Sequence, residues 1–126
     1  MTLTDPGPPA ELKLKRKSRV LEVHFRDGES FVLPFEYLRV HSPSAEIHGH
    51  GVGEGKLELA KEDVRIMDVV PVGNYAVCLK FSDGHDSGLY SWAYLYELGA
   101  KYEQKWARYL ERCEKLGYER KPPPEA

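Results

Sequence analysis

The 126-residue chain has only two cysteines, Cys78 and Cys113, and they are not spaced as a zinc-binding pair. Two cysteines are too few for a disulfide scaffold, which favours a reducing, cytoplasmic location. The chain has no apolar run near the roughly 20 residues that a membrane span needs, and its first residues have no signal-peptide core. We therefore expect a cytoplasmic protein that does not associate with membranes.

An excess of charge of one sign is also absent. The 18 Lys and Arg residues nearly balance the 20 Asp and Glu residues, so the formal net charge is −2. Because nucleic-acid-binding domains are typically basic, this balance predicts that the protein does not bind nucleic acid. Hydrophobic residues make up 41% of the chain, which is enough for the core of one small domain.

Both ends of the chain have little apolar sequence with which to build a core. Four of the first ten residues are Pro or Gly, and prolines recur near the C-terminus. We predict a disordered segment over residues 1–18, a single domain over 19–117 and a disordered tail over 118–126. Within the first segment, basic residues alternate with Leu12 and Leu14. We interpret that run as a solvated lead-in to the first strand, with contact to an acidic partner as the alternative.

Alternating hydrophobicity and turn residues predict strands in both halves of the domain. The strands are expected over residues 20–25, 30–33, 57–60, 64–72 and 75–81. Asp27-Gly28 and Gly73-Asn74 are typical hairpin turns, because glycine adopts a positive φ without steric cost. In residues 64–72, the alternation places Ile66 and Val70 on the same face.

Helical spacing of apolar residues predicts helices between the hairpins and after them. A short helix follows Pro34, a second follows the N-cap candidate Ser91, and Gly99 ends or bends that second helix. A longer amphipathic helix begins at residue 102 and stops at Gly117. The predicted fold class is α+β: a small, mainly antiparallel sheet built from two hairpins, with a short helix between them and C-terminal helices packed on one face.

Two segments, residues 39–50 and 83–92, concentrate side chains that are capable of chemistry. His48 and His50 are two residues apart, and imidazoles commonly bind Zn, Fe or Ni. We take His48, His50 and His85 as candidate metal ligands. Partners for such a site are His41, Glu46 and Asp86. A solvated glycine-rich loop is the competing interpretation of the histidine pair.

The same two segments also provide a candidate interaction surface. It comprises Arg39, Ser42, Ser44, Glu46, His50, Asp83, His85, Ser87 and Trp92. No complete catalytic constellation is present, and no residue is assigned a catalytic role. A weaker hypothesis is a small enzyme in which Asp83, His85 and Asp86 form an acid–base group, since an aspartate can orient an imidazole.

The motifs in these segments resemble those of a known family. They are LRVHSPSAE at residues 38–46, GHG at 49–51 and DGHDSGLYSW at 83–92, followed by Leu95. They are similar to the family named for the N-terminal domain of γ-butyrobetaine hydroxylase, also called domain of unknown function 971. The resemblance extends roughly from Arg19 to Leu98.

The resemblance implies a zinc site that this chain does not reproduce. In the full-length hydroxylases the domain precedes an iron- and 2-oxoglutarate-dependent barrel, and it holds structural zinc through three cysteines and one histidine. Here Ser42, Ser44 and Ile47 stand at the cysteine positions, and only His85 matches. A hydroxyl is a far poorer zinc ligand than a thiolate, and isoleucine cannot bind a metal at all, so we expect this site to be lost. No cofactor is assigned, and zinc or iron would need His85 with new partners.

The resemblance also suggests the kind of function. The chain is too short to hold the barrel as well, so hydroxylase activity does not follow from the resemblance. Similar domains are fused to P-loop ATPases that carry iron–sulfur clusters. Our leading hypothesis is a non-catalytic binding or adaptor domain with a protein partner, such as an iron–sulfur carrier ATPase or a related factor. A metal-binding domain and a small acid–base enzyme are the alternatives.

Overall fold

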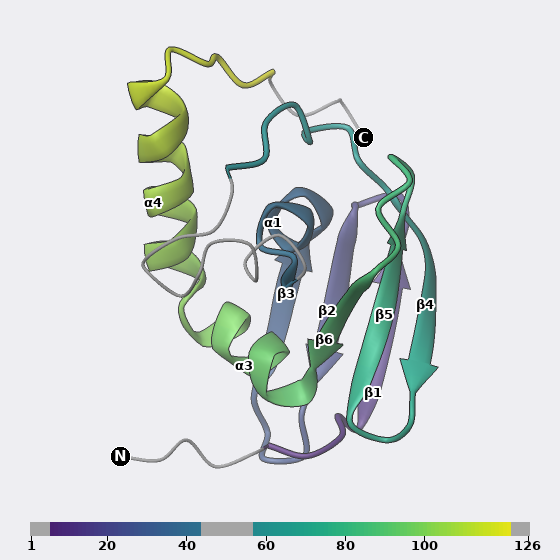
Figure 1. The fold of residues 1–126 in the computed structure, drawn as a ribbon. Helices are drawn as coiled ribbons and strands as arrows, with labels where there is room; N and C mark the ends of the chain where they lie inside the picture. Colours follow the sequence, from purple (N-terminus) through teal and green to yellow (C-terminus); the bar gives the residue numbers. More distant parts are fainter. Residues whose placement is uncertain (1–5, 44–56, 122–126) are drawn as a thin grey trace.

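The computed structural model describes residues 6–43 and 57–121. Its elements are β1 (Glu11–Lys15), β2 (Val20–His24), β3 (Ser30–Pro34), α1 (Phe35–Val40), β4 (Ile66–Val72), β5 (Ala76–Phe81), β6 (Gly88–Ser91), α3 (Trp92–Ala100) and α4 (Tyr102–Lys115). Strands β1–β2–β3 form one antiparallel sheet, and β4–β5–β6 form a second (Figure 1). The predicted α+β class is confirmed, with the strands divided between two three-stranded sheets.

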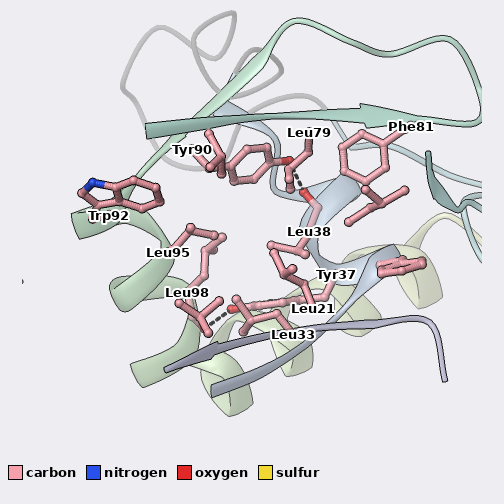
Figure 2. Packing of buried hydrophobic residues seen from close by; sticks show 14 of the residues in the cluster. Leu21, Leu33, Tyr37, Leu38, Leu79, Phe81, Tyr90, Trp92, Leu95 and Leu98 are labelled. Carbon is pink, nitrogen blue, oxygen red and sulfur yellow. Dashed lines mark hydrogen bonds between the residues drawn. The ribbon is translucent and has the colours of Figure 1, made fainter. Parts of the chain in front are cut away.

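The core lies between the two sheets and is closed by α1 and α3 (Figure 2). Two buried tyrosines tie these layers together. The hydroxyl of Tyr37 in α1 donates to the carbonyl of Leu98 in α3 at 2.6 Å, and that of Tyr90 in β6 donates to the carbonyl of Leu38 in α1 at 2.6 Å. A buried hydroxyl without a partner would be destabilising, so these bonds fix α1 against both neighbours.

The first strand corrects the prediction that residues 1–18 are disordered. Residues 11–15 form β1, in which Leu12 and Leu14 pack against the core while Lys13 and Lys15 are exposed. Pairing with β2 satisfies the backbone groups on one side of this strand and partly buries its two leucines. The alternating basic run is therefore an edge strand. Residues 1–5 lie outside the described part of the chain.

Strand β4 contains a β-bulge that the alternating pattern does not predict. The pairing with β5 shifts between Ile66 and Asp68, which makes Met67 the additional residue. Ile66 is fully buried, whereas Met67 is 55% exposed. After the bulge, Val69 faces the core and Val70 faces outward, so the prediction that Ile66 and Val70 share a face is wrong.

Two further segments differ from their predictions. Residues 57–60 form no strand, and Leu57 and Leu59 instead pack against a small cluster of Val40, Tyr109 and Cys113. Residues 88–91, for which no strand was predicted, form β6.

Residues 118–121 are attached to the domain, which corrects the prediction of a disordered tail over 118–126 for this described part. The Tyr118 hydroxyl donates to Glu62 Oε2 at 2.6 Å. The Arg120 guanidinium pairs with Glu36. Residues 122–126 lie outside the described part.

Local signals mark the start of α3 and the end of α4. The Ser91 side chain accepts a hydrogen bond from the Tyr94 N–H and caps α3, as predicted. Gly117 follows α4 with a φ of +75°. Gly99 does not end α3 but lies within it, and the interruption between α3 and α4 is at Lys101. Among the described residues, no helix is both long and apolar enough to cross a membrane.

Candidate functional site

The structure brings the described parts of the two motif segments into contact. Arg39 lies in α1, and its Nε donates to Asp83 Oδ2 at 2.9 Å. Ser42 lies just after α1, and its Oγ is hydrogen-bonded to His85 Nε2 at 2.7 Å. The end of α1 and the turn between β5 and β6 therefore form one cluster, which we call the His85 cluster: Arg39, Ser42, Asp83 and His85.

Local backbone bonds hold the β5–β6 turn in shape. The Phe81 N–H donates to the His85 carbonyl at 2.9 Å, and the His85 N–H donates to Asp83 Oδ1 at 3.1 Å. Gly84 has a φ of +92°, a conformation in which a side chain would be strained. The turn thus directs the His85 imidazole toward Ser42.

Charged groups alternate around Arg39, whose side chain is only 7% exposed. Its Nη2 lies 3.5 Å from Glu58 Oε1, and Asp83 Oδ2 also accepts a hydrogen bond from Lys61 Nζ at 2.7 Å. Two cations and two carboxylates therefore neutralise one another. Arg39 Nη1 is buried and has no hydrogen-bond partner within the described ranges.

The ionisation of Asp83 follows from these neighbours. Burial alone would raise the pKa of this carboxyl group. The hydrogen bond from Lys61, the backbone N–H of His85 and the charge and hydrogen bond of Arg39 outweigh burial and lower the pKa to about 2. Asp83 is therefore a carboxylate across the physiological range.

His85 is neutral at pH 7. Burial lowers the pKa of its imidazole below the usual value, and the positive charge of Arg39 lowers it further. Ser42 is fully buried. A neutral ring and a hydroxyl thus share a hydrogen bond in a partly desolvated position.

Gly88 is necessary for this arrangement. A Cβ at this position would lie 2.7 Å from Ser42 Oγ and 3.1 Å from the Tyr90 ring. Glycine is the one residue that leaves room for Ser42 beside β6. The sequence motif contains Gly88, but its spacing alone does not reveal the contact.

The Ser42–His85 pair does not fit a zinc ion. A tetrahedral zinc about 2.1 Å from each ligand atom would hold the two atoms about 3.4 Å apart. The observed separation of 2.7 Å is that of a direct hydrogen bond. In residues 6–43 and 57–121, no group of three or more His, Cys, Asp or Glu side chains is arranged to hold a metal.

Several predicted site residues fall outside the described part of the chain. They are Ser44, Glu46, Ile47, His48 and His50.

The structure corrects part of the candidate interaction surface. Arg39, Ser42 and Trp92 are buried, with exposures of 6%, 0% and 7%. Trp92 belongs to the core, and its indole N–H donates to the Asn74 carbonyl at 2.8 Å. Ser87 is exposed in the turn. The motif residues that looked most suited to contact a partner thus serve mainly to join the elements of the fold.

Sequence reasoning missed a row of side chains beside the turn. Val70, Cys78 and Leu89 are paired across β4, β5 and β6, so they share the outer face of this sheet. Leu89 is 45% exposed, and Val70 and Cys78 are half-buried. The Cys78 thiol donates to the Asp86 carbonyl at 3.1 Å, which joins this outer row to the turn. Only the strand register, which depends on the bulge in β4, brings the three residues together.

Comparison with known proteins identifies related chains. A family model described as gamma-butyrobetaine hydroxylase-like, N-terminal, matches residues 12–96. One protein studied by NMR in solution is 48% identical, with a TM-score of 0.83 over 100% of this chain and 95% of that chain. A second NMR solution structure is 42% identical, with a TM-score of 0.77 over 95% of this chain and 94% of that chain.

A crystal structure from Acidithiobacillus ferrooxidans adds a family name. That protein, of unknown function, belongs to the domain of unknown function 971 family. It is 41% identical, with a TM-score of 0.64 over 78% of this chain and 99% of that chain. Comparison with curated proteins gave no match. From the family match and these similar structures together, we conclude that the chain belongs to the gamma-butyrobetaine hydroxylase-like N-terminal domain family.

Proposed function

We propose that the chain is a non-catalytic, cytoplasmic protein-binding domain. Its contact surface is the exposed part of the β5–β6 turn, Asp86 and Ser87, together with the outer row of Val70, Cys78 and Leu89. The observation that carries this proposal is the pairing inside the His85 cluster. The reactive groups of the motif bind one another, while the adjoining surface presents apolar side chains.

The bonding of Asp83 and His85 argues against an acid–base enzyme. A general base must reach a substrate proton within hydrogen-bond distance. Asp83 Oδ2 already accepts from Arg39 and Lys61, and Oδ1 accepts from the His85 backbone. His85 Nε2 is bound to Ser42. Both groups would have to leave existing partners before they could act on a substrate.

The same bond argues against the metal-binding alternative. Coordination through His85 Nε2 would require Ser42 to be displaced, and a serine hydroxyl is a poor replacement ligand. The alternative with His48 and His50 thus depends on breaking a contact that the fold provides. We favour a structural role for His85, in which it holds the turn in shape for a partner.

The outer row has the composition of a small protein contact. Leu89 is an exposed apolar residue at the β6 end of the row, beside the half-buried Cys78 and Val70. The next cross-strand pair on this face, Asp68 and Lys80, provides polar groups at its border. Apolar centres with polar rims are typical of protein interfaces, and a patch of this size suits a transient contact. Both cysteines are free thiols, which agrees with a reducing compartment.

The first partner to test is an iron–sulfur carrier ATPase, because similar domains are fused to such proteins. Binding of the purified ATPase to the purified domain would be measured by calorimetry. Leu89→Glu places a charge in the apolar row, and we expect it to weaken binding at least tenfold. Leu116→Glu is the matched control, because Leu116 is 65% exposed just after α4 and lies outside the outer row.

Two results would overturn this proposal. One is the absence of binding between the wild-type domain and the ATPase. The other is an equal loss of affinity in both leucine variants, with circular dichroism showing that both are folded. Such a loss would mean that general charge, and not the outer row, determines binding.

A further inference from the structure

A groove runs along the free edge of β3, in the other sheet. It has a volume of about 460 Å³ and is lined by residues 30–33 of β3 and residues 99–104 where α3 meets α4. Figure 1 shows β3 on the side of the molecule nearer α4, with β4 at the opposite side. The groove is therefore separate from the surface proposed above.

The hydrogen bonds at the two ends of the β2–β3 ladder fix its pattern. The Phe25 N–H donates to the Glu29 carbonyl at 2.8 Å, and the Phe35 N–H donates to the Arg19 carbonyl at 2.9 Å. In an antiparallel ladder, hydrogen-bonded pairs alternate with pairs whose backbone groups point away from each other. These two bonds therefore determine the direction of every backbone group between them.

Among the described residues, this pattern leaves backbone groups on the groove side without a strand partner. Phe31 and Leu33 are hydrogen-bonded to β2, so the N–H and C=O groups of Ser30 and Val32 point to the free edge. Pro34 adds a carbonyl without an N–H. The floor of the groove thus offers two donors and adjacent acceptors at the spacing of an extended chain.

The free edge of β4 is protected against pairing with another strand, whereas the free edge of β3 is not. In β4, the bulge and Pro71 interrupt the edge, and the Arg16 guanidinium donates to the Ile66 carbonyl at 3.1 Å. Such features block unwanted strand pairing. Strand β3 has no charged residue, and Val32 is 57% exposed. The free edge of β3 therefore has neither the bulge nor the charged side chains that usually prevent strand pairing.

The opposite wall suits an uncharged segment. Gly99 leaves room for the Phe31 ring, and the exposed Lys101 and Glu103 bring one charge of each sign. A strongly acidic or basic segment would gain little from this balance. An extended chain with apolar and hydroxyl side chains would pair with β3 and contact Val32.

We propose that the β3 groove binds an uncharged, extended segment of a partner protein, which adds as a fourth strand to the β1–β2–β3 sheet. Strand addition uses backbone hydrogen bonds for affinity and alternate side chains for specificity. This site is independent of the outer row, so the two surfaces permit simultaneous contacts with a partner or partners.

The probe is a set of seven-residue peptides selected from a random phage-displayed library on the full-length protein and then synthesised with blocked ends. We expect the selected peptides to be uncharged and rich in β-branched residues. Binding should slow hydrogen exchange at the Val32 amide at least tenfold. Leu89→Glu should leave this binding unchanged, which separates failure here from failure of the function proposed above.

A matched pair of variants tests the backbone contact. Val32→Pro removes an N–H that faces the groove and not β2, and we expect it to reduce peptide affinity at least tenfold. Val32→Thr keeps the N–H and the shape, and we expect it to bind like the wild type. Hydrogen exchange at the Val32 amide of the wild-type protein tests the backbone contact even if Val32→Pro fails to fold.

Three outcomes would overturn the proposal. The first is an unchanged exchange rate at Val32 with peptide bound, and the second is selection of charged peptides that bind elsewhere. The third is a concentration-dependent dimer that protects Val32 without peptide, which would make a second copy of this chain the occupant.

Discussion

Replacing Gly99 by alanine sets helix propensity against packing. Alanine is favoured over glycine inside a helix by about 1 kcal/mol, so propensity alone predicts that Gly99→Ala stabilises α3. Packing predicts the opposite. An added Cβ would lie 2.2 Å from Cγ of the Phe31 ring, far inside van der Waals contact.

The ring of Phe31 has little freedom to move away. It makes edge contacts with Phe25 at 6.1 Å and with Tyr96 at 5.2 Å between ring centroids. Overpacking of this kind costs about 1–3 kcal/mol, and the closeness of this contact favours the upper end. After subtraction of the propensity gain, we expect Gly99→Ala to lower the free energy of unfolding by about 2 kcal/mol, or the Tm by about 10 °C.

Urea unfolding followed by circular dichroism would measure this effect in a double-mutant cycle with Phe31→Ala. Once the ring is removed, Gly99→Ala should become neutral or stabilise the protein by up to about 1 kcal/mol. The reasoning is refuted if Gly99→Ala stabilises the wild type, or if its effect is the same with and without the Phe31 ring.

Three other predictions concern the His85 cluster and its surroundings. Gly88→Ala should destabilise the fold by about 1–3 kcal/mol in urea unfolding, because its Cβ would meet Ser42 Oγ at 2.7 Å. An unchanged urea midpoint of unfolding would contradict this contact. Asp83→Asn should reduce stability by about 2 kcal/mol, because it removes one of the two carboxylates beside the buried Arg39 charge and leaves Glu58; a loss below about 0.5 kcal/mol would show that the pair contributes little. Burial lowers the pKa of His41 to about 4, so the folded state binds fewer protons than the unfolded state below pH 6.5. The free energy of unfolding should therefore be full above pH 6.5 and fall by about 3 kcal/mol toward pH 4. His41→Asn should flatten this part of the pH profile, measured by urea unfolding.

Features set by a few neighbouring residues were predictable from the sequence. Gly28 turns the first hairpin with a φ of +96°, and Ser91 caps α3 through its own side chain. These structures depend on a positive φ or a local hydrogen bond, and both are visible in a short stretch of sequence.

Features that depend on a distant partner were not predictable. Leu12 and Leu14 gain burial only by pairing with β2, so β1 looks like a charged lead-in when read alone. The bulge at Met67 arises from the match between β4 and β5, and it changes which valine faces the core. Periodicity within one segment contains no information about that match.

The candidate site was predicted only in part for the same reason. The motifs drew attention to Ser42 and His85, and the fold joins them at 2.7 Å. Glu58 and Lys61 complete the charges around the cluster, yet no sequence spacing relates them to it. Burial of Trp92 follows from packing of the core, so its place in a motif misled the assignment to a surface.

Long-range ¹H–¹⁵N NMR spectra of the His85 imidazole, recorded at pH 7 before and after one equivalent of Zn²⁺, test most directly whether His85 is bound to Ser42 and not to a metal. We predict the pattern of a neutral ring whose Nε2 resonance does not change when zinc is added. A zinc-dependent shift of Nε2 would contradict the proposal that His85 holds the turn for a protein partner.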